Sequence, residues 1–482
     1  MTKSILVERD IPISMRDGVR LYADIYRPNL SQPVPVLLQR TPYGKGFAQT
    51  AFALMAAEND YAVVIQDTRG RWASEGDSYP FVAEFQDGYD TVEWVAHQSW
   101  ANGNVGMFGC SYVGYTQLSA ATTQPPSLKT IIPWHTFCDA HSLFFAGGAP
   151  ALGVGVSWSL VAGAQMAIIR QPIPEDQKAP LWSQFIDSVN KMSTGEFFRQ
   201  LPVLHFPLIG QDGIFRLLTD ILQHPTKDSF YDQINCAHDK INIPVFHIGG
   251  WYDIFTSQTL HDFSTLRQLN KAPQKLLIGP WTHGSYSSLV GEVDFGIQSS
   301  DMFLLPDLIS LRWFDAWLKG KSNGIMDEPP IHMFVMGINQ WRDEYEWPLS
   351  RAKLTRFYLH SEGAANTSRG DGSLSQIEPG DEPSDSYLYD PRNPVPTRGG
   401  GLCCWNPILP PGTYDQRRIE ERLDVLVYST PPLEHHVEVT GPIQVHLWAS
   451  SSAVDTDFTA KLVDLSPCGF ARNVQDGIVR AR

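Results

Sequence analysis

The sequence predicts an α/β fold followed by a C-terminal all-β domain. Short apolar runs, most of them separated by helix-like stretches, recur at 34–38, 62–65, 105–108, 130–132, 245–248 and 275–278. This alternation is typical of a mainly parallel sheet that helices cover on both faces. From Ile331 onward, alternating short strands and Pro/Gly/Asp turns predict a sandwich or jelly roll, with strands expected at 356–359, 437–439 and 444–448.

The strand rhythm stops between about residues 137 and 240. Apolar residues there follow helical spacing, and a segment of this length without a strand is too long for one crossover. We therefore expect a helical insertion that caps the sheet; ordinary flanking helices are the alternative. A further helix is expected over 308–318, ending at Gly320. The expected domains are 1–136 and 241–330 for the α/β domain, 137–240 for the cap and 331–482 for the β domain.

A serine lies inside the glycine-bracketed segment 109–114, between a strand pattern and a helix pattern. A serine on a sharp strand-to-helix turn exposes its hydroxyl at the top of the sheet. Amides at the start of the helix can then face an anion formed beside it. The second glycine falls one residue later than in the generic G-x-S-x-G motif, so the motif alone leaves open a plain glycine turn.

Two further side chains stand directly after strand patterns, namely Asp253 and His283. The carboxyl ends of parallel strands meet at one edge of a sheet, so both side chains should reach the edge that carries Ser111. A serine hydroxyl needs a positioned base, and the base needs an orienting group. The chain order Ser, Asp, His is that of the strand-turn-helix serine hydrolases and predicts a triad. Taken singly, each residue could be a turn residue or a structural histidine.

Composition excludes several classes of function. A formal charge of −15 disfavours nucleic acid or an anionic membrane as partner. No uninterrupted apolar run approaches the roughly 20 residues that span a bilayer, and the N-terminus lacks the apolar stretch of a signal peptide. Six scattered cysteines are too few for a disulfide framework. We expect a cytoplasmic protein with reduced thiols, in which Cys110 is a small buried hydrophobe.

Metal and nucleotide cofactors are not expected. His435-His436 and Cys403-Cys404 are adjacent pairs whose members would project apart on a strand, and no H-E-x-x-H motif occurs. The chain also lacks the glycine-rich loops that hold nucleotide phosphates.

Further motifs accompany the three candidate residues. They are G-x-S-Y-x-G at 109–114, G-G-W-Y-D at 249–253, G-P-W-T-H at 279–283, M-R-D-G-V-R-L at 15–21, R-T-P-Y-G at 40–44, D-T-R-G-R at 67–71, F-V-M-G at 334–337, W-R-D at 341–343 and Y-D-P at 389–391. Together they resemble the signatures of the cocaine-esterase and X-Pro dipeptidyl-peptidase-like superfamily of serine hydrolases. This resemblance covers nearly the whole chain and implies an α/β-hydrolase domain, an inserted helical cap and a C-terminal jelly roll.

The resemblance also implies roles for individual residues. Ser111 matches the nucleophile, His283 the general base and then acid, and Asp253 the orienting carboxylate. The Tyr43 hydroxyl and the Tyr112 backbone N–H match the two oxyanion donors, and a buried turn tyrosine is the alternative for Tyr43. Three side chains match positions that line an apolar substrate site, with ordinary packing as the alternative: Phe255, Trp158 and Gln49.

Ester hydrolysis of a small-molecule substrate is the first expectation. Amide or peptide acyl hydrolysis, of the X-Pro dipeptidyl-peptidase or β-lactam acylase kind, is the runner-up. A silent carbohydrate-binding protein is a third reading that the intact triad disfavours. The sequence leaves open a homo-oligomer. Residues 477–482 end within a predicted strand where relatives usually continue, so we expect a fragment or a premature end.

Overall fold

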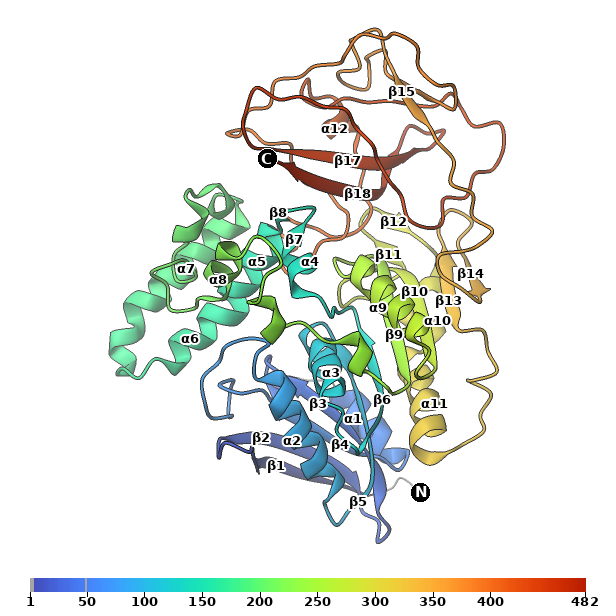
Figure 1. Cartoon of the computed structure of the whole chain (residues 1–482). Coiled ribbons are helices and arrows are strands. Elements are labelled where there is room, and N and C mark those ends of the chain that lie inside the picture. The colour runs from blue at the N-terminus through green and yellow to red at the C-terminus, as the bar shows by residue number, and fades with distance from the viewer. Residues whose placement is uncertain (1–3, 48–49) are drawn as a thin grey trace.

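A mixed sheet with helices on both faces forms the base of the molecule (Figure 1). The computed structural model describes residues 4–47 and 50–482. Within these ranges ten strands form the sheet, in the spatial order β1 (Ile5–Ser14), β2 (Arg20–Pro28), β4 (Ala62–Asp67), β3 (Val34–Thr41), β5 (Ala101–Cys110), β6 (Leu128–Trp134), β9 (Val245–Tyr252), β10 (Gln274–Thr282), β13 (Ile331–Val335) and β14 (Gln340–Glu344). The strands from β4 to β13 in this order are parallel, whereas β1, β2 and β14 pair antiparallel with their neighbours.

All six predicted strands of the α/β domain are confirmed. Their side chains alternate between two cores: Val36 and Leu38 of β3 pack on one face of the sheet, and Leu37 packs on the other. Because both faces are buried, each strand is an uninterrupted apolar run in the sequence. The first two strands were not predicted, since half of β1 is exposed and carries charged residues.

Helices cover the two faces in separate groups. α1 (Thr50–Glu58) and α11 (Pro306–Lys319) contribute to one core, while α2 (Glu84–Ala96), α3 (Tyr112–Thr122) and α9 (Thr256–Leu269) cover the other face. The predicted helix before Gly320 is confirmed as α11. Gly320 adopts a φ of +66° and ends this helix, a conformation that glycine adopts without steric cost.

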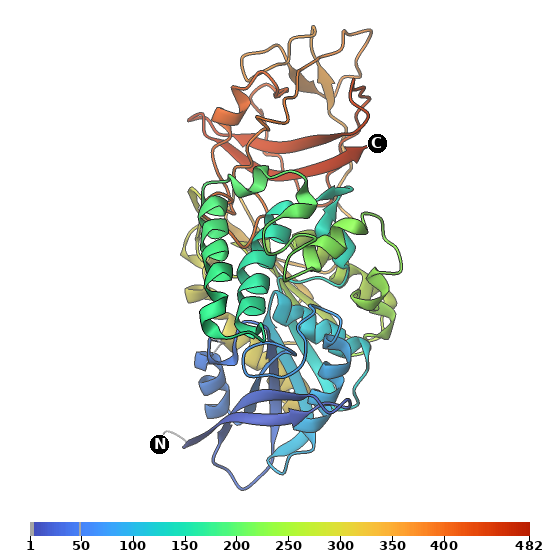
Figure 2. The same ribbon diagram turned by 90° about the vertical axis from the view of Figure 1, so that its left-hand side faces the viewer.

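In the sequence the helical cap lies between β6 and β9, and Figure 2 shows its green helices between the blue strands of the sheet and the red strands of the C-terminal β domain. Its helices are α4 (Ala140–Phe144), α5 (Leu152–Trp158), α6 (Gln165–Arg170), α7 (Ala179–Ser193) and α8 (Leu217–Gln223), with short 3-10 turns at Glu175–Lys178, Phe197–Arg199, Val203–His205, Tyr231–Gln233 and His238–Lys240. The expectation of a strand-free segment is wrong in one detail. A hairpin of β7 (Phe145–Ala146) and β8 (Ala149–Pro150) lies before α5.

One helix is longer and more apolar on average than the search for uninterrupted apolar runs indicated. α5 and α6 are joined by a π-helical stretch, Ser159–Ala164, into a helix over Leu152–Arg170. Among the described residues this helix alone is long and apolar enough to cross a membrane, judged by length and composition only. Its most apolar window is 56% buried inside the protein, as the core helix of a folded domain also would be. The sequence analysis missed it because glycines and polar uncharged residues interrupt the apolar positions.

The C-terminal part differs from the prediction in two respects. β13 and β14 belong to the central sheet, so that sheet extends past residue 330. Beyond them, β15 (Tyr358–His360) pairs with β16 (Ser373–Ser375), and β17 (Thr456–Leu465) pairs with β18 (Ala471–Ala481). The strands predicted at 437–439 and 444–448 are irregular. Their large side chains are exposed, Trp448 by 97%, and a strand without a paired neighbour is not stable.

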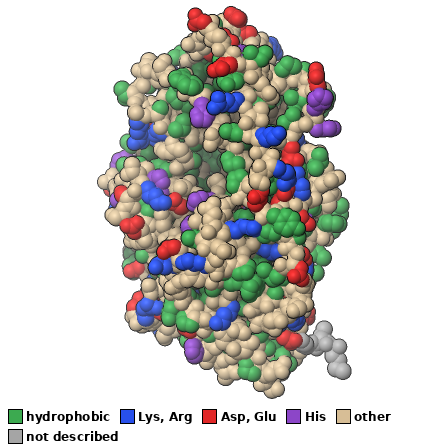
Figure 3. All heavy atoms as spheres, turned by 45° about the vertical axis from the view of Figure 1, so that its right-hand side comes forward, with side chains coloured by type: hydrophobic (Ala, Val, Ile, Leu, Met, Phe, Trp, Pro, Cys, Tyr) green, Lys and Arg blue, Asp and Glu red, His purple; other side chains and the backbone are tan. Residues whose placement is uncertain are grey.

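Several short elements complete the fold. They are the 3-10 turns Lys45–Phe47 and Ile297–Ser299, β11 (Leu289–Val290), β12 (Val293–Asp294), α10 (Asp301–Leu304) and α12 (Arg417–Glu420). On the face shown in Figure 3, acidic, basic and apolar side chains are interspersed and no single kind dominates.

A buried ion pair joins β3 to α2. Arg40 Nη1 lies 2.7 Å from Glu84 Oε2, and both side chains are almost fully buried. Arg40 Nε also donates to Gln66 Oε1 at 2.8 Å. Burial raises the pKa of Glu84 while the Arg40 charge opposes that shift. Removing one partner would leave a buried charge without compensation.

We predict that Arg40→Met destabilises the fold by about 3–5 kcal/mol, because Glu84 loses its counter-charge. The urea midpoint, followed by tryptophan fluorescence, measures this change. Arg392→Met, which breaks an exposed pair with Asp390, is the matched control and should leave the midpoint unchanged. Equal midpoints for Arg40→Met and the control would contradict the assignment.

Candidate active site

Ser111 occupies a strained turn between β5 and α3. Its φ of +65° and ψ of −127° are rare for a residue with a side chain. The Ser111 amide donates to the Trp134 carbonyl at 2.8 Å, which ties the turn to the end of β6. A Cβ on Gly109 would lie 2.2 Å from Val113 Cγ1, so position 109 requires glycine. The turn is therefore the predicted strand-to-helix elbow, with Val113 packed where the generic motif has its second glycine.

The Tyr43 hydroxyl lies beside Ser111. Trp158 Nε1 donates to this hydroxyl at 3.1 Å, and the hydroxyl also interacts with the Ser111 side chain. Tyr43 is 37% exposed as a whole residue, but its hydroxyl is turned toward Trp158 and Ser111. Burial of the hydroxyl raises the pKa of Tyr43, and this effect is larger than the lowering by the hydrogen bonds with Trp158 and Ser111. The phenol therefore keeps its proton, and because Trp158 can only donate, that proton is free for an acceptor at Ser111.

Tyr112 supplies a backbone amide at the start of α3, where helix geometry leaves N–H groups without intrahelical partners. Its side chain is fixed: the hydroxyl donates to Glu84 Oε1 at 2.9 Å and accepts from the Phe81 amide at 2.9 Å. The Tyr112 ring also stacks on Trp158, with centroids 5.9 Å apart. The same tryptophan thus contacts both predicted oxyanion residues.

Asp253 and His283 meet in the loops after β9 and β10. His283 Nδ1 lies 3.2 Å from Asp253 Oδ2 and 3.4 Å from Oδ1. The Phe255 amide donates to Asp253 Oδ1 at 2.7 Å, which fixes the orientation of the carboxylate. Asp253 is 1% exposed in its side chain, and His283 is 15% exposed. Nε2 of His283 is the nitrogen left to receive a proton.

The loops of Ser111 and His283 lie side by side. The Gly284 backbone, next to His283, donates to the Cys110 sulfur, next to Ser111. Within residues 4–47 and 50–482 no hydrogen bond joins Ser111 to His283 directly. Bonds between nucleophile and base often tighten only with substrate bound. Cys110 is only partly buried as a whole residue, so the expectation of a fully buried side chain is not met. Burial of the thiol still raises its pKa, which keeps it protonated and unreactive.

His135 is a further residue in contact with Asp253 that the sequence analysis did not single out. It follows β6, and its fully buried ring contacts Asp253 Oδ2 through Nδ1. Burial disfavours the charged form of Asp253, but the charges and hydrogen bonds of His135 and His283 outweigh it and lower the pKa of this carboxyl below its usual range. The rule that selected Asp253, a polar residue directly after a strand, also fits His135.

Aromatic side chains form a continuous layer beside the triad. Phe255 stacks on Phe137 with centroids 5.5 Å apart and lies 5.2 Å from the His283 ring. The Trp158 ring belongs to the same layer, and its centroid lies 6.3 Å from that of the Phe215 ring. Two of the three predicted substrate-site residues are thus placed next to catalytic candidates. The third, Gln49, lies outside the described residues.

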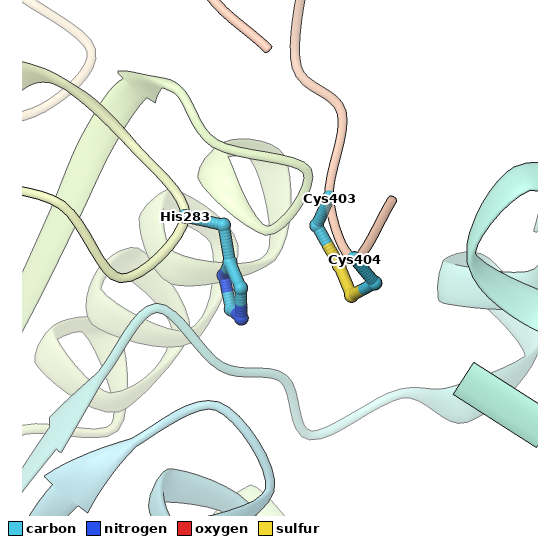
Figure 4. Close-up of side chains that lie close together, drawn as sticks. All are labelled: His283, Cys403 and Cys404. Atoms are coloured by element: carbon cyan, nitrogen blue, oxygen red, sulfur yellow. A yellow bond between two sulfur atoms is a disulfide. The ribbon is translucent and has the colours of Figure 1, made fainter. Parts of the chain in front are cut away.

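The cysteine expectation requires a correction. Cys403 and Cys404 form a disulfide, and Figure 4 shows both side chains turned toward His283. The reason is local geometry: Cys404 has a φ of +80°, so this segment is no strand and its neighbouring side chains do not project apart. The other four cysteines are free.

Elsewhere in the structure, ligand atoms of Cys138, His238 and Asp262 lie within 4.8 Å of one another, close enough to hold a metal ion. His238 and Asp262 already form an ion pair, with Nε2 of the histidine 2.8 Å from Oδ1 of the aspartate.

The described geometry agrees with comparisons to known proteins. Residues 17–285 match the X-Pro dipeptidyl-peptidase (S15) family, and residues 323–482 match the C-terminal non-catalytic domain of X-Pro dipeptidyl-peptidases. The chain is 40% identical to the cocaine esterase of Rhodococcus sp. (strain MB1 Bresler), over 99% of this chain and 83% of that protein.

Solved structures extend the agreement to three dimensions. An α-amino acid ester hydrolase superposes with a TM-score of 0.76 at 25% identity, covering 100% of this chain and 83% of that one. An aminopeptidase from a marine sediment Thaumarchaeota archaeon, at 22% identity and a TM-score of 0.69, shares the fold over 100% of this chain and 82% of its own. The family match over more than half of the chain and the 40% identical relative show that this protein is a serine hydrolase of the S15, X-Pro dipeptidyl-peptidase, family.

Proposed function

We propose that the protein hydrolyses carboxylic esters of small molecules through an acyl-enzyme on Ser111. The observation that carries the proposal is the arrangement around Ser111: a strained turn exposes its hydroxyl, the buried pair of His283 and Asp253 lies in the adjoining loops, and the Tyr43 hydroxyl interacts with it. The esterase named among the relatives supports the same bond class.

In the acylation step His283 Nε2 takes the Ser111 proton as Oγ attacks the ester carbonyl carbon. Asp253 holds Nδ1 and balances the positive charge that the ring gains. The carbonyl oxygen becomes an oxyanion between the Tyr43 hydroxyl and the Tyr112 amide, which stabilise charge that exists only in the transition state. His283 then gives its proton to the leaving alcohol, and water repeats the sequence to release the acid.

The environment of Asp139, the residue that precedes the first helix of the cap, favours an ester over a peptide with a free α-amine. A site for an ammonium group needs an unpaired carboxylate. Asp139 accepts from Lys227 Nζ at 2.7 Å and from the Ser142 side chain at 3.0 Å. It also caps α4 through the Ser142 amide. This carboxylate is therefore already compensated, and the aromatic layer beside the triad suits an apolar acyl group.

We predict that Ser111→Ala abolishes labelling by a fluorophosphonate probe and lowers turnover of aryl esters by about 10⁶-fold, because the nucleophile is gone. Mass spectrometry of the labelled wild type should place the probe on Ser111. His283→Ala should also prevent labelling. A panel of aryl esters and X-Pro amides gives the bond class, and a clear preference for the amides would contradict the ester proposal.

For Tyr43→Phe we predict a fall in kcat of about 100–1,000-fold with little change in KM, because one oxyanion donor is lost. The fluorophosphonate should still react at Ser111, though more slowly. Trp158→Phe, which removes the hydrogen bond to Tyr43, should lower kcat less. Tyr345→Phe, a change on the surface, serves as control. Unchanged kcat in Tyr43→Phe would remove this residue from the mechanism.

His135 is predicted to act as a positioning residue through Asp253. Because the pKa of Asp253 is lowered, the stability contributed by its ionised form is present above the unfolded value, about 3.9, and is lost as the pH falls through the lower folded value. His135→Gln removes one lowering contribution, so the carboxylate protonates at higher pH. The loss of stability on acidification, followed as the urea midpoint between about pH 5 and pH 2, should therefore begin at higher pH in His135→Gln, and an unshifted profile would assign His135 to packing alone.

A further inference from the structure

A loop of the β domain, residues 401–411 (the strap), lies against the active site. Reciprocal hydrogen bonds between Gly400 and Gly412, at 2.7 and 3.0 Å, close the loop at its base. A Cβ on Gly401 would lie 2.9 Å from the Asp253 carbonyl oxygen, so the strap contacts the backbone of the loop that carries the catalytic carboxylate. Trp405 packs against the core of the α/β domain and cap. The strap is thus fixed at both its base and its middle.

The strap presents two sulfurs to His283. The Sγ atoms of Cys403 and Cys404 and one ligating atom of His283 all lie within 4.8 Å of one another. Figure 4 shows the disulfide side chains facing the imidazole across a short space. Cys403 is 3% exposed as a residue whereas Cys404 is exposed, so solvent reaches the pair from the Cys404 side. His283 Nδ1 is occupied by Asp253, which leaves Nε2 as the nitrogen for a ligand.

We propose that Cys403, Cys404 and His283 form an inhibitory site for a thiophilic divalent cation, Zn²⁺ or Cd²⁺, once the disulfide is reduced. Two thiolates and an imidazole are ligands of the kind that such ions prefer, with water as the fourth. Zinc bond lengths of about 2.3 Å to sulfur and 2.0 Å to nitrogen set ligand atoms roughly 3.5–3.8 Å apart. Small movements of the three side chains would reach that spacing.

The chemistry of opening the site is a two-electron exchange. A small dithiol attacks the Cys404 sulfur, the bond between the two protein sulfurs breaks, and the reagent closes into its own disulfide. The dithiol is oxidised, and Cys403 and Cys404 are reduced and receive its two protons. The cation then displaces both thiol protons and takes the lone pair of His283 Nε2.

The inhibition rests on the proposed function, because it requires His283 to be the general base. A metal-bound Nε2 cannot accept the Ser111 proton, so the cation and catalysis compete for one nitrogen. The disulfide is then the form in which hydrolysis is insensitive to soft cations, and the dithiol is the sensitive form.

The test uses the full chain, reduced anaerobically with dithiothreitol, desalted and titrated with Cd²⁺. We expect one Cd²⁺ per chain, a thiolate-to-cadmium charge-transfer band in the ultraviolet, and a fall in aryl-ester turnover of about 100-fold or more. Addition of EDTA should restore the rate. The oxidised protein should show neither the band nor the inhibition.

Variants separate this site from other thiols. The double variant Cys403→Ser/Cys404→Ser should lose the band and keep its own metal-free rate in the presence of Cd²⁺. Cys468→Ser, a change at an exposed free cysteine, is the matched control and should behave like the wild type. His283→Ala should bind Cd²⁺ more weakly, a readout that does not need activity.

Distinct outcomes overturn the two proposals. A band of equal strength in the double serine variant, or an unaltered rate in reduced protein that carries bound Cd²⁺, would overturn the metal site. Absence of ester turnover and of fluorophosphonate labelling in the metal-free protein would overturn the proposed function, while the band would still report whether the three ligands bind the ion.

Discussion

The buried carboxylate of Asp253 is the constraint around which the active site is built. A charge removed from water is costly unless neighbouring charges and hydrogen bonds compensate it. Here compensation comes from three separate segments: His135 after β6, His283 after β10 and the Phe255 amide at the start of α9. Each of these contacts fixes a loop, so the requirement to satisfy one anion also places the general base.

The opposite side of Ser111 is organised by a chain of polar contacts. Arg40 and Tyr43 come from the end of β3 and the loop after it. Arg40 pairs with Glu84, Glu84 accepts from the Tyr112 hydroxyl, and Trp158 of the cap bonds to Tyr43. Both oxyanion candidates are therefore held by contacts that do not involve substrate. Preorganised donors of this kind need no rearrangement when charge develops.

The β domain is coupled physically to the catalytic domain. The Tyr252 hydroxyl, one residue before Asp253, donates to the Asn473 carbonyl of β18 at 3.0 Å. The Arg480 amide of the same strand donates to the Gly147 carbonyl in the cap hairpin at 2.8 Å. With the strap, these contacts show how a domain that matches a non-catalytic family still bounds the site. It supports the Asp253 loop and places the Cys403–Cys404 disulfide beside His283.

The sequence by itself determined the parallel strands, the elbow at Ser111 and the order of the triad, because buried strands and strand-end residues leave local patterns. The antiparallel edge strands, the place of β13 and β14 and the irregular segment near Trp448 needed the tertiary structure, since pairing partners decide whether an extended segment is a strand. His135 and the Cys403–Cys404 pair also emerged only there. His135 does follow a strand, as Asp253 does, but many residues share that position. Which strand-end side chain contacts Asp253, and that the cysteine pair approaches His283, are decided by the packing of segments far apart in the chain.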